Sequence, residues 1–209
     1  MNSKSFKKYI SYQTFLALGL VIICSSIKGQ INKYAKGYYN NRVDCLELEG
    51  VKSQTSREAI HIYCIGMDYY EKGQYDQAIK SFTKSLEIDP KYFLAYLNRG
   101  DVYYEKGQYD LAITDLTKAL EIDQKNFAAY HNRGVAYYAK GQYGLAIKDL
   151  TKALEIDPKN ANAFYHRGIA YENKGQYDLA IKDYTKVLEI DPKYTEASNS
   201  LENIKKKKK

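Results

Sequence analysis

Histidine and cysteine are the residues of this chain whose chemistry could support catalysis or metal binding, and both are scarce. The chain has 209 residues, with three His and three Cys. No nucleophile and base are spaced as a catalytic constellation, and three thiols cannot form a four-thiolate zinc site. A metal at His131 and His166 would need at least one further ligand, so polar residues beside a binding surface are the simpler interpretation. We therefore predict no enzyme, no metal and no cofactor.

The glycines do not form a phosphate-binding loop, because they recur singly at a fixed step. Gly66, Gly100, Gly134 and Gly168 are 34 residues apart, as are Asp89, Asp123, Asp157 and Asp191. Such a period is the signature of a repeat protein. The step defines four units, 59–92, 93–126, 127–160 and 161–194.

Each unit has the pattern of two helices. In 127–160, Tyr130, Gly134 and Tyr137 follow helical spacing, and Gly141 lies in a KGQ turn. A second amphipathic run follows and ends at Pro158, since proline cannot continue a helix. Small residues such as Gly134 allow the two helices to approach closely. One such hairpin cannot bury its apolar face alone, so neighbouring hairpins must stack.

These positions resemble the tetratricopeptide repeat family, whose pattern places Gly at position 8, Tyr at 11, Ala at 20 and 27 and Pro at 32. Repeat two departs from it with Gln124 in place of Pro, which weakens that stop signal. The resemblance implies an all-α, right-handed superhelical solenoid of four helix–turn–helix repeats with a concave groove. In repeat four the matching residues are Phe164, Gly168, Tyr171, Ala180, Tyr184, Val187 and Pro192.

Arg and Asp recur together at positions 7 and 23 of repeats two to four, and repeat one lacks both. We expect an ion pair inside each of these repeats, because pairing between repeats would leave Arg99 facing Ser81. Shared ancestry of three recently duplicated units would give the same pattern without a pair. The expected pairs are Arg99 with Asp115, Arg133 with Asp149 and Arg167 with Asp183.

The resemblance also implies which residues line the groove. This surface is aromatic and apolar with few charges, and Tyr is favoured at interfaces. The recurring Tyr70, Tyr104 and Tyr138 are equally explained as scaffold. Some family members bind the C-terminal carboxylate of a peptide through Lys and Arg side chains. The equivalent positions of this chain lack those cations, which disfavours a ligand bound by its C-terminal carboxylate. The groove residues are Tyr63, Met67, Tyr70, Leu97, Asn98, Asp101, Tyr104, His131, Asn132, Val135, Tyr138, Tyr165, Ile169 and Glu172.

Residues 1–29 have the pattern of a signal peptide or an N-terminal membrane anchor. Lys4, Lys7 and Lys8 precede the uncharged FLALGLVIIC at 15–24. A spanning helix needs about 20 residues, and 9–27 could just supply them. In either case the repeats are exported, to the periplasm or exterior. A cytoplasmic protein is the third alternative.

Two further segments flank the repeats. Residues 30–58 are a linker or a degenerate half-repeat, and Cys45 could bond to Cys64 in an oxidising compartment, or both could be buried thiols. Residues 195–209 contain a capping helix and a polylysine tail. The tail is either solvated or a contact for phosphate or anionic lipid.

The charge distribution bears on the partner. The net charge is +7, yet residues 59–194 carry 18 basic and 19 acidic groups. Nucleic acid is therefore an unlikely partner, because a phosphate-binding surface needs clustered cations on the folded body. We expect a scaffold or adaptor that binds a peptide or helix of a partner protein in the groove. The alternative is a structural component that self-associates, or joins an envelope assembly, through its convex face or ends. The partner's identity and the oligomeric state stay open.

Overall fold

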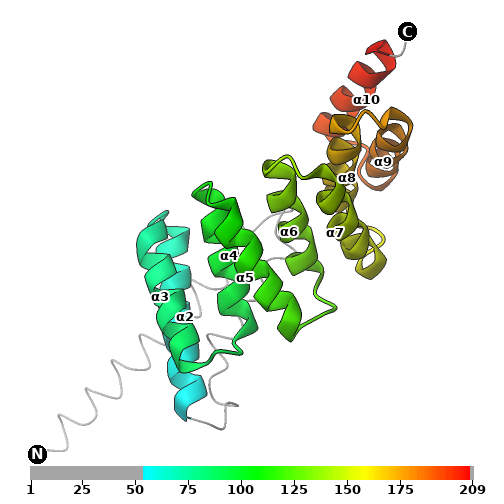
Figure 1. Ribbon diagram of the computed structural model, residues 1–209. Helices are drawn as coiled ribbons and strands as arrows, with labels where there is room; N and C mark the ends of the chain where they lie inside the picture. The colour runs from blue at the N-terminus through cyan, green and yellow to red at the C-terminus, as the bar shows by residue number, and fades with distance from the viewer. Residues whose placement is uncertain (1–53, 208–209) are drawn as a thin grey trace, which may run out of the picture. The chain divides into compact units, whose positions relative to one another are not determined.

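The computed structural model describes residues 54–207, with side chains from 57 to 206. Within this range the chain forms nine α-helices and no strand (Figure 1). The helices are α2 (Gln54–Glu71), α3 (Tyr75–Ile88), α4 (Phe93–Glu105), α5 (Tyr109–Ile122), α6 (Phe127–Ala139), α7 (Tyr143–Ile156), α8 (Ala161–Asn173), α9 (Tyr177–Ile190) and α10 (Thr195–Lys207).

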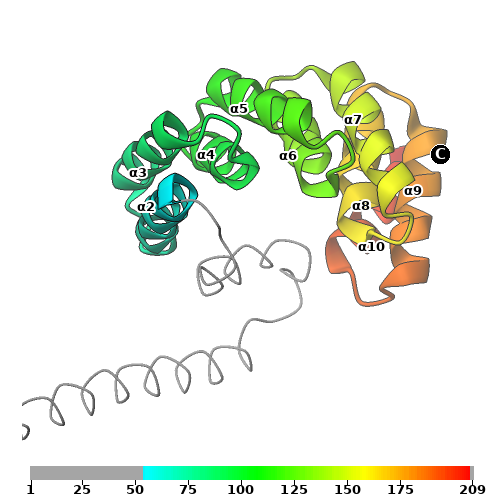
Figure 2. The same ribbon diagram turned by 90° about the horizontal axis from the view of Figure 1, so that it is seen from below.

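Successive helices pair into four hairpins, one for each 34-residue unit. Helix α2 packs on α3, α4 on α5, α6 on α7 and α8 on α9, while α10 packs on α9. Figure 2 shows α2, α4, α6 and α8 on one side of the stack and α3, α5, α7 and α9 on the other. The expected all-α solenoid with a C-terminal capping helix is confirmed. Helix α2 begins at Gln54, inside the segment 30–58 that was expected to be a linker or a degenerate half-repeat.

The turn inside each hairpin depends on a glycine in the left-handed region. Gly141 has φ of 73°, and the equivalent glycines have φ of 70–73°. Its N–H donates to Tyr138 O at 2.8 Å, and the N–H of Gln142 donates to Tyr137 O at 2.9 Å. This geometry satisfies the last carbonyls of α6, as in a Schellman-type ending.

The two helices of each hairpin touch at the other set of glycines. A Cβ added at Gly134 would lie 2.8 Å from Leu150 Cγ and 3.3 Å from Ala146 O. Leu150 is fully buried, as is Ala146. The two helices can therefore approach this closely only with glycine on the first helix. A large side chain of the second helix, here Leu150, packs against that glycine.

The turns that follow repeats two and three are each held by an Asp and an Asn, whether or not proline is present. Asp157 Oδ2 accepts a hydrogen bond from Asn160 Nδ2 at 3.1 Å, and Asn160 Oδ1 caps α8 by accepting from Ala163 N at 3.1 Å. Asp123 and Asn126 form the same bonds in repeat two, where Gln124 replaces proline. The weakened stop signal at Gln124 therefore has no structural consequence.

The N-terminal predictions fall almost entirely on residues 1–53, which lie outside the described residues. Cys64 is disulfide-bonded rather than a free thiol, and its expected partner Cys45 lies outside this range. Within the part of the chain that the structure describes, no helix is long and apolar enough to cross a membrane.

Candidate interaction surface

An Arg–Asp ion pair is present in each of repeats two to four. Arg99 Nε donates to Asp115 Oδ2 at 2.6 Å, and its Nη2 donates to Asp115 Oδ1 at 2.9 Å. The third contact reaches back to the preceding repeat, where Thr83 Oγ1 accepts from Nη1 at 2.8 Å. Arg133 and Arg167 repeat this arrangement with Thr117 and Thr151. Each arginine thus joins its own hairpin to the one before.

Each of these guanidinium groups also lies between two aromatic rings of its own helix. Arg99 Cζ is 5.7 Å from the centroid of Tyr96 and 6.0 Å from that of Tyr103. These distances allow cation–π attraction. Burial lowers the pKa of Arg99, but the hydrogen bond and charge of Asp115 outweigh it, so the pKa is raised overall. The same ion pair in repeat four, Arg167 with Asp183, lines an open hollow of about 580 Å³.

The surface of α2, α4, α6 and α8 that carries the predicted groove residues is called the first-helix face below. Half of those residues are part-exposed on it. Neighbouring first helices contact each other, α2 with α4, α4 with α6 and α6 with α8. The surface is therefore continuous across the four repeats. The part-exposed residues are Tyr70, Tyr104, Val135, Tyr138, Tyr165, Ile169 and Glu172.

Three predicted groove residues belong to the core instead. Tyr63 is fully buried, stacked edge-on against Tyr92 with centroids 5.1 Å apart. Its hydroxyl accepts from Asn98 Nδ2 at 2.8 Å, and both Asn98 and Leu97 are 4% exposed. The prediction that these side chains line an open surface is wrong, because the contact between α2 and α4 covers Tyr63 and Asn98, and residues of α5 and α6 pack over Leu97. Met67, Asp101, His131 and Asn132 keep 7–9% exposure.

A chain of hydrogen bonds joins four polar residues across α4, α6 and α8. Asn132 Nδ2 donates to Asp101 Oδ1. The amide oxygen of the same side chain, Asn132 Oδ1, lies 3.1 Å from His131 Nδ1. Because an amide oxygen can only accept, His131 Nδ1 carries the proton and donates it. Since a neutral imidazole has one N–H, His131 Nε2 accepts from His166 Nδ1, 3.1 Å away. The amide orientation of Asn132 therefore sets the tautomers of both histidines.

Burial controls the protonation of this chain. It raises the pKa of Asp101 to about 7, with the hydrogen bond from Asn132 opposing the shift and Glu105 adding to it. Burial also lowers the pKa of His131, despite the bond to Asn132, and lowers the pKa of His166 to about 4, with His131 contributing. Both histidines are therefore neutral at pH 7.

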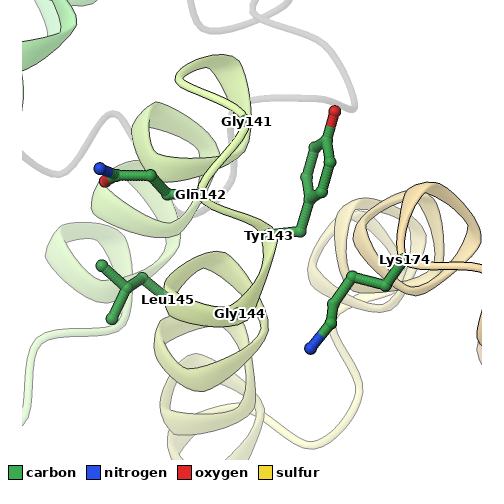
Figure 3. Close-up of a pocket in the computed structure, with 6 residues that line it drawn as sticks. All are labelled: Gly141, Gln142, Tyr143, Gly144, Leu145 and Lys174. Carbon is green, nitrogen blue, oxygen red and sulfur yellow. The ribbon is translucent and has the colours of Figure 1, made fainter.

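Lys–Asp ion pairs connect the turns of adjacent repeats, and one is missing. Lys106 pairs with Asp76 of the preceding repeat, and Lys140 pairs with Asp110. In the repeat that precedes Lys174, the position of these aspartates is occupied by Gly144. Figure 3 shows Lys174 directed towards Gly144, where an open hollow of about 480 Å³ replaces the carboxylate.

Sequence reasoning missed both the polar chain and these Lys–Asp pairs. The pairs have a signal, since Lys at position 14 and Asp at position 18 of the preceding repeat recur with the same period as the Arg–Asp pairs. The polar chain has none, because Asp101, His131 and His166 have no counterpart at the equivalent positions of the other repeats. Among the described residues, no group of three or more His, Cys, Asp or Glu could hold a metal ion.

Comparisons with known proteins agree with this geometry. A family model described as "TPR repeat" matches residues 66–107, 100–141 and 136–175, and one described as "Tetratricopeptide repeat" matches 161–194. Together they cover more than half of the chain, which belongs to the tetratricopeptide repeat family. The curated proteins yield no match to it.

Solved structures show similar solenoids. A crystal structure of MamA is 30% identical with a TM-score of 0.67, covering 69% of this chain and 84% of that one. The first TPR of Spaghetti (RPAP3), bound to an HSP90 peptide, is 31% identical with a TM-score of 0.54, covering 56% and 94%. YrrB, described as a TPR protein with an unusual peptide-binding site, is 26% identical with a TM-score of 0.64, covering 70% and 75%.

Proposed function

We propose that this chain is a non-enzymatic interaction scaffold whose first-helix face binds a peptide segment or a helix of a partner protein. The observation that carries the proposal is the row of part-exposed aromatic and apolar side chains from successive repeats. Tyr104 and Val135 are followed by Tyr138, Tyr165 and Ile169 on helices that contact each other. Aromatic side chains supply large contact area at low entropic cost. The peptide complex of RPAP3 and the peptide site of YrrB support this proposal.

The test compares a face variant with a matched control on the opposite helices. The double variant Tyr104→Ala/Tyr138→Ala removes two rings from the first-helix face. Leu145→Ala/Leu179→Ala removes side chains that are 45% and 43% exposed on α7 and α9. Cross-linking in the native cell, followed by mass spectrometry, should show partner peptides that are lost from the face variant and kept by the control. Equal cross-linking of both folded variants would contradict the proposal.

A second candidate function has its own observation. Large apolar side chains recur on the second helices at the same two positions of repeats two to four. A solenoid with such a surface could self-associate, or join an envelope assembly, through that face. Sedimentation velocity over a hundredfold concentration range distinguishes the candidates, since self-association requires a size that grows with concentration. The residues are Leu111, Leu145, Leu179, Ile122, Ile156 and Ile190, each 36–46% exposed.

We also propose that the repeats act on the exported side of a membrane. The support is the sequence alone, in which Lys4, Lys7 and Lys8 precede the apolar stretch 15–24. The intact mass of the native protein, measured separately in soluble and membrane fractions, tests this. A mass lacking roughly the first 26–29 residues indicates a cleaved signal, and a full-length mass in the membrane pellet indicates an anchor. A full-length protein in the cytosol would refute it.

A further inference from the structure

We infer that the first-helix face selects a peptide carrying a lysine or arginine side chain, and that Asp101 accepts a hydrogen bond from that cation. This inference rests on the proposed function and adds the chemical class of the partner. It comes from three observations: an incompletely bonded buried carboxylate, the sign of the charges on the face, and the tyrosines around them.

Asp101 is a buried carboxylate with a vacant acceptor position. Its side chain is 9% exposed, and Asn132 donates to Oδ1. Within the described residues, the other carboxylate oxygen of Asp101, Oδ2, accepts no hydrogen bond. This oxygen is not fully enclosed by the protein. Buried carboxylates usually accept several hydrogen bonds. An N–H donor arriving from outside the chain would complete the set.

The charges on the first-helix face all have one sign. The resemblance assigns positions 2, 5, 9, 12 and 13 of each first helix to the groove, and no Lys or Arg occupies any of them in the four repeats. The charged residues at those positions are Glu71, Asp101, Glu105 and Glu172. This surface would repel an acidic peptide and attract a basic one.

The tyrosines place aromatic rings beside these carboxylates. Tyr104 is adjacent in sequence to Glu105, and its pKa is raised mainly by burial and then by Tyr109, Glu105 and Tyr138. Those groups are therefore close enough to interact. A lysine or arginine side chain gains cation–π attraction over a tyrosine ring and a charge-assisted hydrogen bond to a carboxylate. Asp101, Tyr104 and Glu105 share one face of α4, at spacings of three and four residues, and Tyr138 lies on α6, which contacts α4. These four residues make up the subsite for one basic side chain.

The experiment uses a phage-displayed library of random 12-residue peptides, selected on the full-length chain. Selected peptides are then synthesised, and their affinities are measured by fluorescence anisotropy. The test variant is Asp101→Asn, because an asparagine oxygen can still accept from Asn132 while the charge is lost. The matched control is Glu121→Gln, which removes one charge from the second helix of the same repeat, where Glu121 pairs only with exposed Lys118.

We expect the selected peptides to be enriched in Lys or Arg. Asp101→Asn should weaken their binding about tenfold, the scale of one charge-assisted hydrogen bond, and Glu121→Gln should change it less than twofold. Replacing the basic residue of a peptide with Gln should have the same effect as Asp101→Asn, and the two changes together should not add. These results would support the inference.

Two kinds of failure are distinguishable. If binding is lost in Tyr104→Ala/Tyr138→Ala but the peptides lack cations, or Asp101→Asn binds them normally, the inference is overturned and the proposed function stands. If no peptide is selected, or the tyrosine variant binds every selected peptide normally, the proposed function fails and the inference fails with it.

Discussion

Arg133 Nε and Asp149 Oδ2 lie 2.6 Å apart, and a second bond of 3.0 Å joins Nη2 to Oδ1. The two residues come from different helices of one hairpin, 16 positions apart. The Asp149 side chain is only 5% exposed and that of Arg133 is 17% exposed. A bidentate pair at this depth is geometrically specific. Either partner left alone would be a buried, uncompensated charge.

The first prediction follows from that burial. Arg133→Leu or Asp149→Leu alone should lower the free energy of unfolding by about 3 kcal/mol. The double variant Arg133→Leu/Asp149→Leu should lose far less than the sum, because it leaves no unpaired charge. Urea denaturation measures all three. Strictly additive losses would show that the residues do not act as a pair. Lys152→Met in the exposed Lys152–Glu155 pair is the control and should leave the free energy of unfolding essentially unchanged.

The second prediction contrasts two helical glycines. Gly134→Ala should destabilise the protein by about 1–3 kcal/mol, because the new Cβ would lie 2.8 Å from Leu150 Cγ. Gly144→Ala should stabilise it by up to about 1 kcal/mol, since its Cβ meets nothing nearer than Lys174 Nζ at 4.0 Å and alanine favours helix. Thermal unfolding distinguishes these opposite signs. Equal effects would mean that hairpin packing at Gly134 is not close.

The third prediction restores a missing ion pair. Gly144→Asp places a carboxylate in the first turn of α7 facing Lys174, as Asp110 faces Lys140. The helix dipole and the exposed pair together should add about 1 kcal/mol to the free energy of unfolding. The gain should shrink in 0.5 M NaCl, because salt screens exposed charges. In a Lys174→Met background only the dipole contribution should remain, and an unchanged gain there would exclude the pair.

The fourth prediction concerns pH. The folded-state pKa of Asp101 is raised to about 7 from 3.8. Between these values the unfolded chain releases its proton first, so this group lowers stability as pH rises. The folded-state pKa of His166 is lowered to about 4 from 6.5. Between those values the unfolded chain binds a proton first, so this group lowers stability as pH falls. The two effects oppose each other between pH 4 and 6.5.

Asp101→Asn removes the pH-dependent contribution of Asp101 to stability and leaves that of His166. The variant should be more stable than the wild type at pH 8, on the order of 2–4 kcal/mol. Its stability should also fall more steeply than that of the wild type as pH drops from 6.5 to 4.5. Urea denaturation at pH 5, 6, 7 and 8 measures this. Parallel curves with no difference at pH 8 would mean that Asp101 is not held in an environment that disfavours its charge.

The 34-residue period was enough to predict the hairpins and their partners in packing. Gly134 and Leu150 belong to patterns that repeat four times, and each pattern reports one contact that must be made in every hairpin. The pairing of Arg133 with Asp149 was visible for the same reason, because both residues are present in three repeats and both absent from the other. The family could be read from the same periodic positions.

The surface between repeats could not be predicted in the same way. Whether Tyr63 faces a partner or the core depends on how closely α2 approaches α4, and no local pattern encodes that distance. The chain from Asp101 through Asn132 and His131 to His166 joins three helices, and only Asn132 has a counterpart, Asn98, in another repeat. Local periodicity specifies what happens within a hairpin, whereas burial and protonation at this surface depend on side chains brought together from different repeats by the stacking of whole hairpins.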